Sequence, residues 1–165
     1  MYKKIIKIFV AAVLSSAIIG CNTQSGPSEA SINTLRHLNG DLDSVFNELK
    51  SSYETFEPAK MDFALEGLNS YIDKASAELK DMKIENGCQQ IHKAMLEKVE
   101  TMRGIAAKDA KELVRIYKIP DSDFTPELRQ QWDNISASAD NKMKDVNAKV
   151  NQAFAETSNP KTQAK

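Results

Sequence analysis

The stretch from Ala59 to Ile84, AKMDFALEGLNSYIDKASAELKDMKI, decides the fold. Its apolar residues recur at alternating steps of four and three, and this spacing places them on one side of a helix. They are Met61, Leu65, Leu68, Ile72, Ala75, Leu79 and Met82. Strict alternation of this kind is typical of helices that pack in left-handed bundles at a crossing angle of about 20°. The stretch therefore predicts a helix that buries one face against other helices.

Similar apolar stripes predict a helix before this stretch and another after it. The first runs over residues 31–56, with Ser31 as the expected N-cap, and the other over residues 88–118. In the second of these, strict register would place Asp109 on the apolar stripe. We therefore expect the stripe to shift to Ala110 at that point.

The fourth predicted helix has a clear start. Thr125 is suited to the N-cap, Pro126 to the first helical position and Glu127 to the first turn. Its stripe continues to Phe154. Pro58 is expected to begin the helix over 59–84, and Asn86-Gly87 is expected to cap that helix in a left-handed conformation.

Together these segments predict an all-α protein, an antiparallel up-down-up-down four-helix bundle about 40 Å long. No run of β-branched and aromatic residues with period two indicates strands. We expect residues 1–20 to be a cleaved leader, 21–30 a flexible tether, 31–156 the bundle and 157–165 a disordered tail.

The first 20 residues have the pattern of a secretory signal peptide. A basic start with Lys3, Lys4 and Lys7 precedes an uncharged run from Ile8 to Ile19. A basic region, an apolar region and a small residue at the cut define such leaders. The apolar run is shorter than the roughly 20 residues that a membrane-spanning helix needs.

The end of the leader, Ile18-Ile19-Gly20-Cys21, resembles the lipobox of bacterial lipoproteins. This resemblance implies that the thiol of Cys21 receives a diacylglyceryl group and that the leader is cut before this residue. The protein would then be anchored in a bilayer by its acyl chains without spanning it. Asn22, in place of Asp, implies the outer membrane facing the periplasm if the host is Gram-negative. An ordinary leader would instead leave Cys21 free to pair with Cys88.

The charge of the chain gives no sign of a nucleic-acid partner. The leader carries three of the 22 basic residues and none of the 23 acidic residues, so the remainder has a formal charge of −4. Such a surface has no general attraction for nucleic acid.

Cys88 and His92 are the residues considered for a metal site, because ligands four apart lie on one helical face. Two ligands are too few, and His37 is expected to face outward. Haem is disfavoured because the fourth helix has no histidine and the Cys-x-x-Cys-His motif is missing. We therefore expect the methionines to fill the core and the protein to hold no cofactor.

The end of the bundle far from Cys21 is the expected place for a partner. Asp121 and Asp123 faintly resemble the start of a calcium loop, but turn and cap chemistry explains them as well. Phe124 follows them in the same loop. Phe63 either belongs to an exposed patch or packs on Phe56, and we favour the second interpretation.

No Ser-His-Asp arrangement, phosphate loop or His-Glu-x-x-His motif is present in the sequence, and we expect the protein not to be an enzyme. The favoured function is a membrane-anchored envelope lipoprotein that binds another envelope protein. No motif distinguishes a pilotin-like role from that of an immunity or stress lipoprotein. The alternative is a carrier of a small ligand, haem or metal within the bundle. A homodimer, bridged through Cys88, is also open.

Overall fold

The computed structural model describes residues 28–55 and 57–158. These residues form the helices α1 (Glu29–Tyr53), α2 (Pro58–Asp81), α3 (Gln89–Gly104), η1 (Ile105–Ala110), α4 (Lys111–Tyr117), η2 (Asp121–Asp123) and α5 (Pro126–Thr157). Because α3, η1 and α4 follow one another without a break, they make one long rod. The described residues are thus an all-α bundle of four rods with no strand, as predicted.

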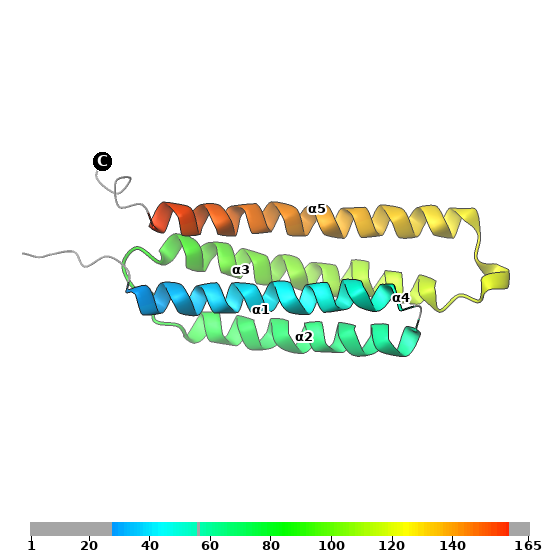
Figure 1. Ribbon diagram of the computed structural model, residues 1–165, viewed down its shortest axis with the longest axis horizontal. Coiled ribbons are helices and arrows are strands. Elements are labelled where there is room, and N and C mark those ends of the chain that lie inside the picture. The colour runs from blue at the N-terminus through cyan, green and yellow to red at the C-terminus, as the bar shows by residue number, and fades with distance from the viewer. Residues whose placement is uncertain (1–27, 56, 159–165) are drawn as a thin grey trace, which may run out of the picture.

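The rods lie side by side, and the chain reverses direction from each to the next (Figure 1). At one end, the backbone N–H of Ser28 donates to Glu85 at 2.8 Å, and Thr157 Oγ1 donates to the Gly87 carbonyl at 3.3 Å. We call this the Ser28 end. The opposite end, called the Pro58 end, holds the start of α2 and the loop between α4 and α5.

The core consists of the predicted stripes, with few exceptions. In α2, five stripe residues are buried: Met61, Leu68, Ile72, Ala75 and Leu79. Leu65 and Met82 are half-buried at the edge of the core. In α1, the spacing of Leu38 and Leu42 predicts Val45 as the next core residue, but Phe46 is buried there and Val45 is only half-buried.

Two predicted helix ends at the Ser28 end are wrong. The N-cap of α1 is Ser28, whose side chain accepts from the backbone N–H of Ser31, so α1 begins at Glu29. The second helix stops at Asp81 because Met82 adopts an extended conformation. Gly87 does have the left-handed φ of 92°, but it makes the turn before α3 and does not cap α2.

The predicted start of α5 is confirmed. Thr125 is the N-cap and accepts a hydrogen bond from the Leu128 backbone N–H, with Pro126 at the first helical position and Glu127 in the first turn. Pro58 likewise begins α2. The fixed φ of proline fits a first turn, where the missing N–H would have no helical partner.

The third rod contains a π-helical turn, η1, where the sequence pattern slips. A π-helix holds more residues per turn than an α-helix, so it moves the following residues around the axis. Ala110 is buried, while Asp109 is half-buried and paired with Lys142 at 2.6 Å. The expected shift of the stripe to Ala110 is therefore confirmed, and η1 is its cause.

The helices cover residues 29–157, close to the bundle predicted over 31–156. The predicted leader over 1–20, Cys21, most of the tether and nearly all of the tail over 157–165 lie outside the described residues. No helix in the described part of the chain is both long and apolar enough to cross a membrane.

Candidate functional site

The gap between α1 and α5 is the widest between adjacent rods. Over the described lengths of both helices, no Cα atom of α1 lies within 8 Å of a Cα atom of α5. Only side chains bridge this gap. At the Ser28 end, for example, the Arg36 guanidinium lies 5.5 Å from the ring centre of Phe154.

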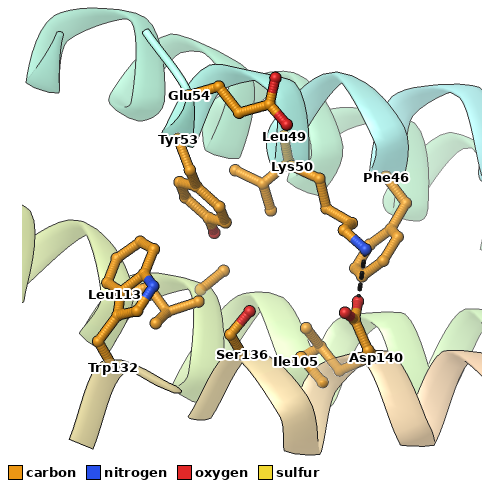
Figure 2. Close-up of a pocket in the computed structure, with 12 residues that line it drawn as sticks. Phe46, Leu49, Lys50, Tyr53, Glu54, Ile105, Leu113, Trp132, Ser136 and Asp140 are labelled. Carbon is orange, nitrogen blue, oxygen red and sulfur yellow. Dashed lines mark hydrogen bonds and ion pairs between the residues drawn. The ribbon is translucent and has the colours of Figure 1, made fainter. Parts of the chain in front are cut away.

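Near the Pro58 end the same gap holds a cavity of about 200 Å³ that is partly open to solvent (Figure 2). Its walls come from α1, from η1 and α4, and from α5. The lining residues are Phe46, Leu49, Lys50, Tyr53, Glu54, Ile105, Ala110, Leu113, Trp132, Ser136, Ala139 and Asp140. Ile105 and Ala110 are the first and last residues of η1, so the π-turn forms part of the wall.

Three aromatic side chains lie on the side of the cavity toward the Pro58 end: Tyr53 and Trp132 line it, and Tyr117 packs against both. The Trp132 ring meets Tyr53 edge-on at 5.3 Å between centroids and Tyr117 edge-on at 4.5 Å. The Tyr117 hydroxyl donates to the backbone carbonyl of Tyr53 at 2.7 Å. Edge-to-face pairs at such distances favour a fixed geometry. These contacts favour one arrangement of the three rings, which we call the aromatic wall.

The Tyr53 hydroxyl is buried and has no hydrogen-bond partner within the described chain. Figure 2 shows it directed into the space between α1 and α5, where the Ser136 hydroxyl also points. Burial raises the pKa of Tyr53 well above its ordinary value, so the group stays a neutral phenol and a hydrogen-bond donor. An unpaired buried hydroxyl costs about 1–3 kcal/mol.

An ion pair bounds the cavity on the side away from the aromatic wall. Lys50 Nζ lies 2.7 Å from Asp140 Oδ1 and links α1 to α5 (Figure 2). Both side chains are about half exposed, so the pair contributes little to stability. Because the two charges are paired at the rim, neither Lys50 nor Asp140 brings an unpaired charge to the interior of the cavity.

Between this cavity and the Ser28 end, the gap is filled by a buried polar cluster around Lys98. The Lys98 side chain is 0 % exposed, and its ammonium donates to Asp43 at 2.6 Å and to the Asn39 side chain at 2.7 Å. Asn147 from α5 donates to the same Asp43 carboxylate at 3.1 Å. Burial lowers the pKa of Lys98, although Asp43 opposes that shift. The cluster joins α1, α3 and α5.

Sequence reasoning missed this cluster, although a signal was present. Lys98 follows Met95 by three residues and precedes Val99, so it lies on the apolar side of α3. Asn39 and Asp43 are four apart and flank the apolar stripe of α1. A lysine on an apolar face opposite an acid on another stripe predicts a buried pair, but only when the facing helices are known.

Cys88 and His92, the residues considered for a metal site, each have other contacts in the bundle. Cys88 is only 2 % exposed, and burial raises the pKa of its thiol. The His92 ring donates from Nε2 to the Leu79 carbonyl at 2.7 Å, so this nitrogen already has a partner. Among the described residues, no group of three His, Cys, Asp or Glu side chains is placed to hold a metal ion. A buried sulfur also argues against a disulfide between two copies through Cys88, because the thiol would first have to reach the surface.

The remaining predicted residues lie at the Pro58 end. Asp121 and Asp123 bound the short helix η2, where Ser122 donates to Asp123 at 3.0 Å. This arrangement agrees with turn chemistry. Phe63 is 78 % exposed and Phe124 38 % exposed. Such exposure of Phe63 favours the surface-patch interpretation over packing on Phe56, a residue outside those described.

Comparison of the chain with protein-family models, with curated proteins and with solved structures finds no match. The geometry and the sequence pattern therefore carry the functional argument.

Proposed function

We propose that this chain is a lipid-anchored lipoprotein of the bacterial envelope whose helical domain binds another envelope protein without catalysing a reaction. Acyl chains on Cys21 provide the anchor. The Pro58 end provides the binding surface.

The observation that carries the proposal is the placement of the chain relative to Cys21. The described fold starts at Ser28, a few residues after Cys21. Ser28 lies at one extreme end of the bundle, where it contacts Glu85. An anchor at Cys21 would hold that end near the bilayer, and the Pro58 end would then point away from it.

The Pro58 end also carries the exposed apolar side chains. Phe63 in α2 and Phe124 after η2 are the two large hydrophobic residues that are exposed in the described part of the chain. Phe63 lies over a groove with Val45 and Tyr71, whereas Phe124 borders a hollow with Tyr117 and Ile119. Exposed aromatic residues beside hollows are common at protein-binding surfaces.

The anchor is tested by replacing Cys21 with serine. We expect the wild-type chain to sediment with membranes and to carry a lipidated Cys21 at its N-terminus by mass spectrometry. The Cys21→Ser variant would lose both properties. A wild-type N-terminus at another residue, or an unmodified Cys21, would overturn the anchor.

The binding surface is tested by site-specific photocrosslinking in cells that express the full chain. A crosslinker placed at Phe63 or Phe124 should give a defined adduct with one envelope protein. The matched control is Asn151, an exposed position near the Ser28 end of α5. Equal adducts from Asn151, or none from both phenylalanine positions, would contradict the proposal.

A further inference from the structure

We propose that the cavity between α1 and α5 binds a small, neutral, single-ring molecule that carries one hydrogen-bond acceptor. This inference concerns the interior of the bundle and does not rest on the proposed anchor or protein partner.

The size of the cavity sets the size of the ligand. The space measures about 200 Å³. An engineered protein cavity of about 150 Å³ lined by apolar side chains holds benzene. The cavity described here therefore has room for one ring with a short substituent, and it is too small for haem.

The walls select an apolar ring. Phe46, Leu49, Ile105 and Leu113 supply aliphatic and aromatic surface, and Trp132 is held in place by its two tyrosine neighbours. Small side chains at Ala110, Ser136 and Ala139 leave the space open. The lining is mixed, with somewhat more apolar than polar surface, so it suits a ring that also carries a polar group.

The Tyr53 hydroxyl selects the acceptor. It points into the cavity, is buried, and has no partner within the described chain (Figure 2). A ligand carbonyl or ether oxygen would accept from this hydroxyl and remove the cost of leaving it unpaired. Because the phenol stays neutral, it cannot balance a cation.

The rim excludes charged ligands. Lys50 and Asp140 neutralise each other, and the exposed carboxylate of Glu54 would repel an anion. A charge placed deeper would lose its hydration without gaining an opposite charge.

The π-turn is an independent reason to regard this cavity as a site. Single π-turns within α-helices are rare and are frequently found at functional sites. Here η1 places its first and last residues, Ile105 and Ala110, on the cavity wall. The irregular turn and the unpaired hydroxyl thus meet in one place.

Trp132 is the single tryptophan of the chain, so its fluorescence reports on the cavity directly. The full chain, reconstituted in phosphatidylcholine vesicles, is titrated with acetophenone and with ethylbenzene. These probes share a ring and differ in the carbonyl acceptor. We expect a saturable change in Trp132 emission with each probe.

Two variants make the test specific. Tyr53→Phe should weaken the binding of acetophenone about tenfold, the equivalent of about 1.4 kcal/mol for one hydrogen bond. The binding of ethylbenzene should be unchanged. Ser136→Leu should fill the cavity and abolish saturation with both probes. Cooperative thermal unfolding of each variant, followed by circular dichroism, checks that the bundle is intact.

A response that rises linearly with probe concentration in the wild type would overturn the site. If Tyr53→Phe weakened the binding of both probes equally, the role of the hydroxyl would be overturned. Saturable binding that survives in a folded Ser136→Leu variant would place the probe elsewhere and overturn the proposal.

Discussion

The gap between α1 and α5 is bridged differently in its two halves. Toward the Ser28 end, the long side chain of Lys98 fills the gap and brings Asp43 and Asn147 into one cluster. Toward the Pro58 end, beside the π-turn, the gap holds a cavity in which the Tyr53 hydroxyl has no hydrogen-bond partner among the described residues. The first half is thus held by a buried charged cluster, and the second by the aromatic wall and the exposed Lys50–Asp140 pair.

The largest effect is expected where the charged cluster is broken. Asp43→Ala leaves the ammonium of Lys98 buried without its carboxylate. Removing one partner of a fully enclosed pair costs about 3–5 kcal/mol. Because the Asp43 side chain is 35 % exposed, we expect a loss of about 2–3 kcal/mol in the free energy of unfolding, measured by urea denaturation.

The matched control for this change is Asp73→Ala. Asp73 pairs with Arg103 at 2.6 Å on the exposed surface, so its loss should cost less than about 1 kcal/mol. Equal losses for the two variants would show that the buried cluster is no more important than a surface pair.

Enlarging a small residue should lower the stability of the fold in the close-packed core and raise it in the cavity. Ala75→Leu adds volume where α2 is fully buried and should destabilise the fold by about 1–3 kcal/mol. Ser136→Leu adds apolar surface to the cavity and should stabilise it by about 1 kcal/mol. The thermal midpoints of the two variants give the comparison, and destabilisation by both would mean that the cavity cannot accept a side chain.

The two tyrosines of the aromatic wall should respond differently to the loss of a hydroxyl. Tyr117→Phe removes the hydrogen bond to the Tyr53 carbonyl and should cost about 1 kcal/mol. Tyr53→Phe removes a buried hydroxyl that has no partner among the described residues, and should leave stability unchanged or raise it by up to about 1 kcal/mol. Denaturant midpoints measure both changes, and a clear loss in Tyr53→Phe would reveal a partner for that hydroxyl.

The smallest expected effect is a pH dependence from Lys98. Burial lowers its pKa in the folded state, so the unfolded chain binds more protons between that pKa and about 10.4, the usual value for lysine. Stability should therefore rise with pH through this window. The three tyrosines with raised pKa values, Tyr53, Tyr71 and Tyr117, act in the opposite direction only above about pH 10.

The measurement is the free energy of unfolding from about pH 8 to about pH 10 for the wild type and for Lys98→Met. The difference between them cancels the titration of Cys88 and isolates Lys98. We expect the wild type to gain less than about 1 kcal/mol relative to the variant across this range. If the stability of the wild type relative to Lys98→Met fell with pH, Asp43 would raise the pKa of Lys98 by more than burial lowers it.

Much of the fold was predictable because helical periodicity alone determines which residues face the core. The stripe of α2, the start of α5 at Thr125 and the shift to Ala110 follow from spacing and capping rules that act within one helix. The helix ends near Ser28 and Asp81 were missed because several residues could serve as cap or stop there. Local signals do not choose between Ser28 and Ser31.

The cavity and the Lys98 cluster were not predictable because they depend on the distance between two helices. Nothing in the sequence of α1 or α5 states how far apart the two lie. The position of η1 was visible only as a break in register at Asp109, and its effect on the wall near Trp132 required the three-dimensional arrangement. Cys88 and His92 were correctly placed near a helix start, but their partners, the core and the Leu79 carbonyl, lie on other elements.

The hydrogen bond between Ser28 and Glu85 has a mechanical consequence. A pull on the chain from the N-terminal side of Ser28 would load this bond first, and we expect α1 to detach from the bundle starting at its N-terminal turn. Tyr53, at the far end of α1, would be the last to leave its neighbours. Tension of this kind would loosen the Lys98 cluster before the aromatic wall, and single-molecule pulling from position 28 should show Asp43→Ala lowering the early unfolding force while Tyr117→Phe leaves it unchanged.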